Sequence, residues 1–301
     1  MLLDPVLQAL SPQAGEIAVD CTLGFAGHAV AILQRLGSSG KLIGLDLDLD
    51  HLPRARGELA ATGLPFTIHH SNFAALKTIL AQERVDKVDV ILADLGMSSM
   101  QVDDPARGFS YVRDGPLDMR MDRTRGQAAA ELLATITEEA LSEALRELGD
   151  EPAARQIARA LVEARDRGPI ATTRQLAEVV ASAGGRPVSE TTGWRVRRGK
   201  NRWQTHPAAR TFQVLRILVN RELANLEHLL RILPDCLRPG GRAGIISFHS
   251  GEDRLVKKAF REGLDAGAYA EIAAEPVRAS FEEQRANPRS RSAKLRWAKR
   301  G

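Results

Sequence analysis

The stretch Glu16-Ile-Ala-Val-Asp-Cys-Thr-Leu-Gly-Phe-Ala-Gly-His28, followed by Lys41-Leu-Ile-Gly-Leu-Asp46, decides the fold. Its first part is a short apolar run that ends in an acidic residue and turns through glycines toward a helical segment. The apolar residues are continuous rather than alternating, which is typical of a strand covered by helices on both faces. The stretch therefore predicts a strand, a tight turn, a helix and a second strand of a parallel sheet.

The same rhythm continues outward from this stretch. We expect strands over residues 16–22, 41–48, 66–71 and 88–95, with helices between them. Strands that alternate with helices indicate an α/β fold with a mostly parallel sheet.

The rhythm stops after Asp94. Between residues 103 and 205 the pattern predicts helices, one over residues 126–148 and another that begins at the capping box Thr172-x-x-Gln175. We interpret 103–205 as an inserted helical domain, and 1–102 with 206–301 as the domain that contains the sheet.

The last hundred residues return to the sheet. A long amphipathic helix is expected over residues 207–233, ended by Pro234. A turn over 238–241 and a buried strand over 242–249 follow. Two further strands, over 269–277 and 292–298, are expected to form an antiparallel edge.

Composition excludes several classes of protein. The chain has 301 residues, of which 44% are hydrophobic and 27% charged, and no apolar run approaches the roughly 20 residues of a membrane span. Residues 1–10 lack the features of a signal peptide, so we expect a cytoplasmic protein without a membrane partner. Cys21 and Cys236 lack metal-ligand spacing, so no metal is expected.

Acidic residues and a glycine turn indicate a nucleoside-binding site. Asp20 precedes the turn that contains Gly24 and Gly27, where glycine permits close approach of a ligand to the backbone. Asp46 ends the next strand, about 20 residues further on, where a carboxylate can accept hydrogen bonds from ribose hydroxyls. The alternative is an ordinary turn between a strand and a helix.

The turn differs from that of dinucleotide dehydrogenases. Their G-x-G-x-x-G loop binds a pyrophosphate at a helix N-terminus, and Gly24-Phe-Ala-Gly27 lacks this spacing. An acidic Asp20 beside the turn suits a cationic ligand, such as a sulfonium or its amino group, better than a phosphate.

Asp94 is the candidate catalytic residue. It lies in Ala93-Asp-Leu-Gly-Met-Ser-Ser-Met-Gln101, at the carboxyl end of the fourth expected strand, where open α/β sheets place their working residues. A carboxylate there can orient an amine and stabilise the positive charge that grows during methyl transfer. The alternative is that Asp94 only caps the loop.

Seven motifs in order resemble one family. They are Asp20-x-Thr-x-Gly-x-x-Gly-His28, Asp94-Leu-Gly-x-Ser-Ser-x-Gln101, Asp103-Asp-x-x-Arg-Gly-Phe-Ser110, Arg113-Asp-Gly-Pro-Leu-Asp-Met-Arg-Met-Asp122, His206-Pro-Ala-x-Arg-Thr-Phe-Gln213, Ser247-Phe-His-Ser250 with Glu252-Asp-Arg254, and Asn287-Pro-Arg-Ser-Arg-Ser-Ala-Lys-Leu-Arg296. Together they resemble the bacterial ribosomal small-subunit RNA cytosine-N4 methyltransferases, also called the RsmH or MraW family.

The resemblance implies a fold, a cofactor and a substrate. The fold is a class I methyltransferase sheet interrupted by a helical domain, and the cofactor is S-adenosylmethionine. The substrate is a cytidine in the decoding region of 16S ribosomal RNA in the small subunit. With Asp20 from the pattern, the expected cofactor-binding residues are Asp20, Ala26, Gly27, His28, Asp46, Phe73, Asp94 and Gln101.

Three positions depart from the family pattern. Family members usually have glycine at the positions of Cys21 and Ala26, and leucine at the position of Gly251. Alanine at position 26 would be strained if the turn requires a positive φ there.

Basic and aromatic residues indicate where RNA could bind. Arg195, Arg197 and Arg198 lie beside Trp194, a combination that suits phosphate contact and base stacking. The tail over residues 285–300 is also basic. The alternative for both stretches is a solvated surface.

Five further polar residues lie in family motifs near the borders of the insertion or at a strand end. Asp118, Arg120, His206 and Arg210 could line a pocket for a base that has left its stack, or could form an ion-pair network. His249 is a substrate contact or a structural histidine.

Two rival functions remain at the level of sequence. A DNA amino-methyltransferase usually carries a Pro-Pro-aromatic signature where this chain has Asp94-Leu-Gly-Met. A ribosome-assembly factor that binds RNA without catalysis would not need the acids at positions 20, 46 and 94.

Overall fold

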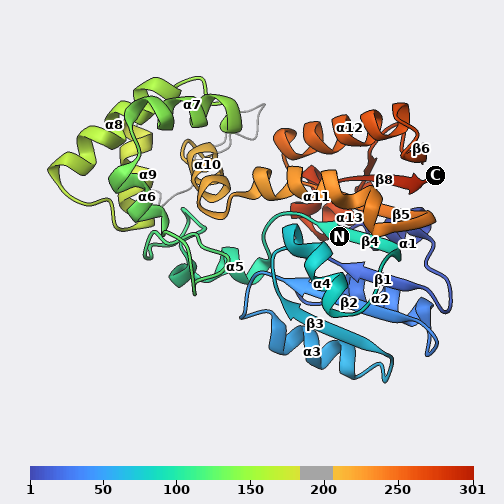
Figure 1. Ribbon diagram of the computed structural model, residues 1–301. Coiled ribbons are helices and arrows are strands. Elements are labelled where there is room, and N and C mark those ends of the chain that lie inside the picture. Colours follow the sequence, from blue (N-terminus) through green and yellow to red (C-terminus); the bar gives the residue numbers. More distant parts are fainter. Residues whose placement is uncertain (184–205) are drawn as a thin grey trace. The chain divides into compact units, whose positions relative to one another are not determined.

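The computed structural model describes residues 1–183 and 206–301. The chain forms two compact units, one of Met1–Gly96 with Leu223–Gly301 and one of Met97–Glu222 (Figure 1). The sequence placed the insertion at 103–205. In the structure the second unit also contains α5 (Ser99–Asp103) and α10 (Ala209–Asn220), at the two borders of that range.

The first unit contains an eight-stranded sheet with the order β3-β2-β1-β4-β5-β8-β6, and β7 also pairs with β8. The strands from β3 to β5 are parallel, and β8 is antiparallel to its neighbours. Their bounds are β1 (Ile17–Asp20), β2 (Lys41–Asp46), β3 (Phe66–His70), β4 (Val88–Asp94), β5 (Leu237–Ser247), β6 (Tyr269–Ile272), β7 (Val277–Arg278) and β8 (Lys294–Arg300). The expected α/β fold with an antiparallel edge is confirmed.

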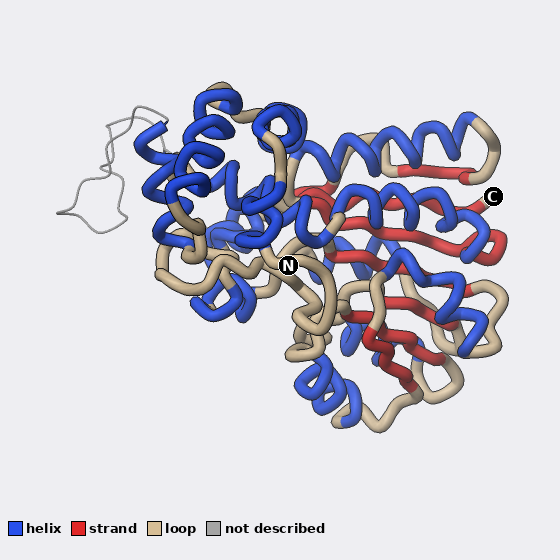
Figure 2. The backbone as a smooth tube through the Cα atoms, turned by 60° about the vertical axis from the view of Figure 1, so that its left-hand side comes forward, coloured by secondary structure: helices blue, strands red, loops and turns tan. Residues whose placement is uncertain are grey.

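Helices cover both faces of this sheet (Figure 2). Successive residues of β1 point to opposite faces, so that Ala18 packs with α1, α2 and α3 while Val19 packs with α4, α11 and α12. Both side chains are fully buried. The helices are α1 (Leu3–Leu10), α2 (Gly27–Leu36), α3 (Leu52–Ala60), α4 (Leu76–Gln82), α11 (Glu222–Cys236), α12 (Ser250–Asp265) and α13 (Phe281–Ala286), with the 3-10 turns η1 (Phe73–Ala75) and η3 (Pro288–Ser292).

The second unit is helical and has its own core. Leu145, Ile157, Leu176 and Leu215 come from four different helices and are buried against one another in one cluster. The elements are α5 (Ser99–Asp103), η2 (Pro105–Arg107), α6 (Ala129–Thr135), α7 (Glu138–Gly149), α8 (Ala154–Arg167), α9 (Thr173–Ala183) and α10 (Ala209–Asn220).

Two helices predicted as continuous are divided in the structure. The helix expected over 126–148 is α6 and α7, because Ile136 leaves the helical conformation and the Thr137 side chain caps the start of α7. The helix expected over 207–233 is α10 and α11, because Arg221 adopts a left-handed conformation, with φ 52°, between them. Pro234 does not end α11, which continues to Cys236.

The end of the chain also differs in detail from the sequence prediction. β5 begins at Leu237, so the expected turn over 238–241 is an irregular part of that strand, with a register shift opposite residues 88–90. The strand expected over 269–277 is two short strands, β6 and β7. In the described part of the chain, no helix is long and apolar enough to span a membrane.

Candidate functional site

The strand order of the first unit places two acidic strand ends side by side. The chain runs from β1 outward to β2 and β3, and then returns to β4 on the other side of β1. Open α/β sheets bind ligands at such a reversal, at the carboxyl ends of the strands. Here β1 ends at Asp20 and β4 ends at Asp94, and Asp20 is paired in register with Leu92.

The loop after β1 is bonded to the strands on both sides. The backbone N–H of Cys21 donates to the Leu92 carbonyl at 2.8 Å, and that of Leu23 donates to the Leu45 carbonyl at 2.9 Å. The Thr22 hydroxyl accepts a 2.6 Å hydrogen bond from the backbone N–H of Asp94. These bonds fix the loop, and with it the start of α2, against β2 and β4.

Ala26 adopts the left-handed conformation that sequence analysis identified as strained for alanine. Its φ and ψ are 62° and 20°, and its backbone N–H donates to the Leu23 carbonyl at 2.7 Å. Ala26 has no exposed surface, whereas Gly27 begins α2 with open space where a Cβ would lie. The turn therefore requires a positive φ at position 26, which explains why glycine suits this position.

Asp46 is held in one orientation at the end of β2. One carboxylate oxygen accepts the backbone N–H of Gly24 at 2.7 Å, and the other accepts the backbone N–H of Asp48 at 2.7 Å. Nδ1 of His51 lies 3.2 Å from the first oxygen. The carboxylate thus joins the glycine loop to the segment before α3, and its role as a ribose acceptor stays a prediction.

Asp20, like Asp94, is an acid at a strand end with a raised pKa. Asp20 is 1% exposed and accepts the backbone N–H of Thr22 at 3.0 Å. Burial raises the pKa of Asp20 to about 7, against the Thr22 hydrogen bond, and the charge of Asp46 raises it further. Among residues 1–183 and 206–301, no lysine or arginine forms an ion pair with either acid.

The two carboxylate oxygens of Asp94 differ in their surroundings. Its Oδ2 lies 3.6 Å from Nδ1 of His28. Its Oδ1 is buried and has no hydrogen-bond partner in the part of the chain that the structure describes. Burial raises the pKa of Asp94 to about 7; the amino group of Met1 opposes this, and the charges of Asp20 and Glu252 add to it.

These acids satisfy the chemical requirement of a cationic nucleoside ligand. A positive group beside Asp20 and Asp94 would stabilise the ionised carboxylates and offset the cost of their burial. A phosphate in the same place would add negative charge beside the buried Asp20 and the partly buried Asp94. The arrangement therefore fits a sulfonium or an ammonium group, as the sequence predicted, and does not fit a pyrophosphate.

Phe73 and Gln101 have separate settings. Phe73 begins η1 just after β3, where the Asn72 side chain accepts the Ala74 N–H, and its ring packs against the core on the α4 face. Gln101 belongs to the second unit, and its amide oxygen accepts the Ser98 N–H at 2.9 Å in the capping box of α5. A cofactor contact by either residue stays a prediction.

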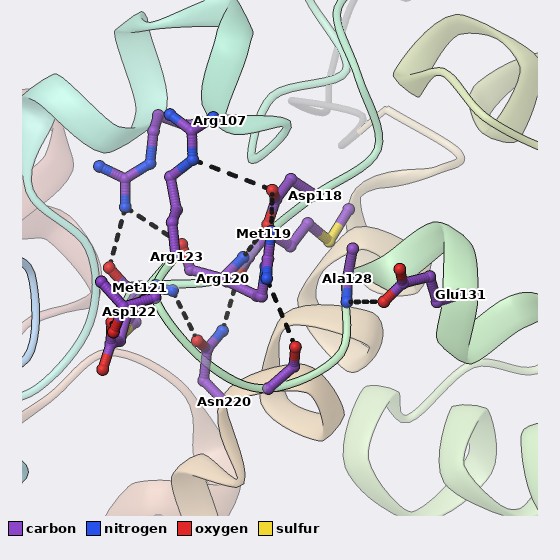
Figure 3. A network of polar contacts seen from close by, with 12 residues as sticks. Arg107, Asp118, Met119, Arg120, Met121, Asp122, Arg123, Ala128, Glu131 and Asn220 are labelled. Atoms are coloured by element: carbon purple, nitrogen blue, oxygen red, sulfur yellow. Dashed lines mark hydrogen bonds and ion pairs between the residues drawn. The ribbon is translucent and has the colours of Figure 1, made fainter.

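Asp118 and Arg120 form an ion pair within the second unit (Figure 3). Nε and one terminal nitrogen of Arg120 donate to the two carboxylate oxygens of Asp118 at 2.8 and 2.9 Å. Although burial opposes it, these hydrogen bonds hold the pKa of Asp118 below its usual range. The arrangement favours the ion-pair interpretation over a base-binding role.

The same network holds the loop that carries this pair. Arg107 is 4% exposed and donates to the carbonyls of Arg120 and Met121, each at 3.1 Å. Asn220, at the end of α10, accepts the Met121 N–H and donates to the Met119 carbonyl, each at 2.8 Å. Figure 3 shows these contacts converging on residues 118–122.

His206 and Arg210 are also engaged within the second unit. The His206 ring stacks on Tyr111, with ring centroids 4.4 Å apart, and its Nδ1 accepts the Ala208 N–H. Arg210 donates to the Asp150 carbonyl at 2.7 Å. Burial lowers the pKa of His206, which favours the neutral form of the ring that stacks on Tyr111.

His249 caps α12. Its Nδ1 faces the backbone N–H of Glu252 at 3.5 Å, and the Glu252 carboxylate accepts the backbone N–H of Phe248 at 2.8 Å. This geometry favours the structural alternative for His249. Arg195, Arg197 and Arg198 lie outside the described residues.

Sequence reasoning missed three residues that organise the site. Thr22 joins the loop to Asp94, His51 holds Asp46, and Tyr111 stacks on His206. Thr22 lies within one of the quoted motifs, and Tyr111 directly follows another. Their placement in the sequence near charged residues could have identified them. His51 lies five residues after Asp46, and no pattern in the sequence sets it apart.

The fold and this edge define the class. A sheet with this strand order, an antiparallel edge and acids at the ends of β1, β2 and β4 is the Rossmann-like fold of class I methyltransferases. The comparison with known families makes the assignment specific, because the chain matches the MraW methylase family over residues 1–301. The chain belongs to this family, which confirms the resemblance inferred from the seven motifs.

Relatives of similar length support the assignment. The chain is 43% identical to ribosomal RNA small subunit methyltransferase H of Geobacter sp. (strain M21), over 98% of this chain and 96% of that protein. It is 44% identical to the protein of the same name from Methylobacillus flagellatus, over 100% of this chain and 93% of that one. A solved rRNA methylase from Streptococcus thermophilus is 10% identical, with a TM-score of 0.43, and the comparison covers 99% of this chain and 93% of that chain.

Proposed function

We propose that the chain transfers a methyl group from S-adenosylmethionine to the N4 amine of a cytidine in small-subunit ribosomal RNA. The observation that carries the proposal is the pair of acids at the strand reversal, the buried Asp20 and the partly buried Asp94, neither of which forms an ion pair with a lysine or arginine in the described residues. Family membership and the names of the relatives support a ribosomal RNA substrate. The motif resemblance supports the cytidine amine.

The residues of the first unit can be given roles on this basis. Asp46 would accept hydrogen bonds from the ribose hydroxyls, in the orientation that Gly24 and His51 impose. Asp20 would balance the positive charge of the cofactor. The loop at Ala26 and Gly27, with Phe73, would contact the rest of the nucleoside.

Asp94 would act on the target amine. The lone pair of a cytosine amine is delocalised into the ring, so the nitrogen is a weak nucleophile. The free Oδ1 of Asp94 would accept a hydrogen bond from this amine, orient it and take the proton that it loses. S-adenosylmethionine supplies an electrophilic methyl group when bound.

The test is a methyl-transfer assay with three substrates. The protein is incubated with methyl-labelled S-adenosylmethionine and, separately, small ribosomal subunits, naked ribosomal RNA and duplex DNA, and the digested nucleosides are identified by mass spectrometry. We expect N4-methylcytidine from one of the RNA substrates. Label in DNA alone would indicate a DNA amino-methyltransferase, and RNA binding without label would indicate an assembly factor.

Asp94→Ala tests the catalytic assignment in the same assay. We expect kcat to fall at least about a hundredfold, because loss of a proton acceptor typically costs 10²–10⁴ in rate. The fold should remain, since the substitution removes a buried oxygen that has no partner among the described residues. Asp235→Ala, at an exposed acid paired with Lys77, is the matched control and should keep the activity of the unmodified protein.

A further inference from the structure

His28 has an unusual position between two oxygen atoms. Its Nε2 lies 2.7 Å from the backbone carbonyl oxygen of Met1, and its Nδ1 lies 3.6 Å from Oδ2 of Asp94. Only 10% of its side chain is exposed. The ring therefore connects the start of the chain to the acid at the end of β4.

The contact with Met1 determines which nitrogen of His28 carries the proton. A carbonyl oxygen only accepts hydrogen bonds, so Nε2 must be the N–H of the neutral ring. Burial lowers the pKa of His28 to about 4, helped by the amino group of Met1 and opposed by the Met1 carbonyl and by Glu283, so the ring is neutral at pH 7. Nδ1 then directs a lone pair toward the Asp94 carboxyl group.

A lone pair facing a carboxylate favours a proton between them. Ionised Asp94 and Nδ1 are both acceptors, and their closest atoms are farther apart than a normal hydrogen bond. Protonated Asp94 would instead donate a hydrogen bond to Nδ1 and remove the repulsion. Catalytic hydrogen bonds are often long in ligand-free proteins and shorten when the substrate binds.

We propose that His28 is a positioning residue for methyl transfer, which holds Asp94 and stabilises its protonated form through a hydrogen bond to Nδ1. This inference rests on the function proposed above. It gives His28 a role toward Asp94, distinct from the cofactor contact that the family resemblance implies. The Nε2 contact with Met1 keeps the ring in the required tautomer.

Methyl transfer to the amine makes one bond, breaks one bond and releases one proton. The lone pair of the amine nitrogen forms the new N–C bond, and the S–C bond of the donor breaks with both electrons remaining on sulfur. The nitrogen then loses one proton to Asp94, whose carboxylate becomes a carboxylic acid. A rotation of the carboxyl group about its Cβ–Cγ bond brings this proton to Nδ1 of His28, and release to water restores the carboxylate.

Other charged groups near the pair do not provide the same stabilisation. Asp20 and Glu252 face Asp94 with negative charge, and the amino group of Met1 faces it with positive charge. Glu283 faces His28 and accepts the backbone N–H of Leu2 at 2.6 Å. Of these groups only His28 is placed to accept a proton from Oδ2, because carboxylates add repulsion and an ammonium group has no lone pair.

The first experiment measures titration in the ligand-free protein. In protein labelled with ¹⁵N-histidine and ¹³C-aspartate, we expect NMR to show His28 as the Nε2–H tautomer at pH 7 and Asp94 titrating near neutral pH. In His28→Asn the amide can donate to Asp94, so the Asp94 titration should move to lower pH. An unchanged Asp94 titration, or a proton on Nδ1 at pH 7, would overturn the proposal.

The second experiment separates positioning from cofactor binding. In His28→Asn we expect kcat to fall about tenfold at pH 8, the acidic limb of its pH profile to move to lower pH, and the Kd for S-adenosylmethionine to change less than threefold. A loss of cofactor affinity with normal kcat at saturating cofactor would make His28 a cofactor contact only. The double variant with Asp94→Asn should be no slower than Asp94→Asn alone, whereas additive losses would contradict the coupling.

His69→Asn is the matched control. His69 also lies beside a carboxylate, with its Nε2 2.6 Å from Glu83, and we expect it to change neither the Asp94 titration nor kcat. Identifying the methylated nucleoside made by the unmodified protein separates the proposed function from the proposed role of His28. If the methylated nucleoside is not N4-methylcytidine, the proposed function fails, while the NMR result still decides whether His28 and Asp94 are coupled.

Discussion

The ionisation of the buried Asp20 destabilises the folded protein. In the unfolded chain this carboxyl ionises near pH 3.8, but in the folded protein its pKa is about 7. Between these values the folded protein holds a proton that the unfolded chain has lost, so the free energy of unfolding falls as pH rises through this window. At pH 8 this rise in pKa lowers the free energy of unfolding by at most roughly 4 kcal/mol.

Asp20→Asn should therefore stabilise the protein at pH 8 and weaken cofactor binding. The amide can still accept the Thr22 N–H, and it carries no charge that burial could penalise. We expect denaturant unfolding from pH 4 to 8 to show a smaller decline for Asp20→Asn than for the unmodified chain. Parallel stability curves for the two proteins would contradict this interpretation.

Asp253 is the control, because its contribution to stability should change with pH in the opposite direction. Its pKa is held below the usual range by Arg296 and Lys294, although partial burial opposes them. Stability from this group is present above the pKa of the unfolded chain and is lost as pH falls. Asp253→Asn should therefore destabilise the protein at pH 8 and have less effect at low pH.

At the scale of the element, Ala26 is the strained residue at the start of α2. A left-handed conformation costs an L-residue roughly 1–2 kcal/mol, whereas glycine adopts it without strain. Glycine also makes the unfolded chain more flexible, which offsets roughly 0.4–1 kcal/mol. Ala26→Gly should raise the unfolding free energy by roughly 0.5–1 kcal/mol, measured by denaturant unfolding.

Ala31→Gly is the matched control for this prediction. It makes the same chemical change in the interior of α2, where glycine costs about 1 kcal/mol relative to alanine. The two variants should therefore shift stability in opposite directions. Destabilisation by both would show that Ala26 is not strained.

Asn220 joins α10 to the loop that carries the Asp118–Arg120 pair. Its side chain bonds the Met119 carbonyl and the Met121 N–H, directly after the strained φ of 62° at Met119. Asn220→Ala removes these bonds and should cost about 2 kcal/mol in the unfolding of the second unit. Hydrogen exchange of the Met121 amide measures the effect directly.

The effect of Asn220→Ala should exceed that of a surface change in the same unit. Arg159 pairs with Glu163 on the exposed side of α8, and Arg159→Ala should change stability by less than about 1 kcal/mol. Equal losses in the two variants would show that the Asn220 bonds do not hold the loop.

The elements differ in how far sequence can predict them. The strands of the parallel sheet were predicted because continuous apolar runs between polar turns have few alternatives. The breaks at Arg221 and Ile136 were missed because neither position has the glycine or proline that normally marks a helix end. Arg221 adopts its left-handed conformation where the chain passes from one compact unit to the other.

The site shows the same limit. The placement of Asp20, Asp46 and Asp94 at strand ends was predicted because each ends an apolar run, and the rule for parallel sheets brings such ends to one edge. The contact between His28 and Asp94 was not predictable, because it depends on β1 and β4 being neighbours and on the carbonyl of Met1 orienting the ring.

At the scale of the whole molecule, overall charge does not account for the proposed RNA binding. The chain has 42 basic and 38 acidic residues, a net charge of +4, and many described arginines are neutralised by nearby acids. A polyanion responds to the local density of basic groups rather than to the sum. Residues 195–198 are the densest basic stretch near an aromatic residue that sequence analysis found.

Replacing Arg195, Arg197 and Arg198 by alanine should therefore weaken RNA binding and flatten its dependence on salt. Each phosphate contact to single-stranded RNA contributes about 0.7 to the slope of log K against log salt, so the loss of three contacts would reduce the slope by about 2. Fluorescence anisotropy with a ribosomal RNA fragment at several salt concentrations measures the slope. The control with the same change in charge replaces three exposed arginines of α8, Arg155, Arg159 and Arg167. An equal loss of slope in both triple variants would mean that RNA responds to net charge alone, and an unchanged slope in the first would leave 195–198 as an ordinary solvated surface.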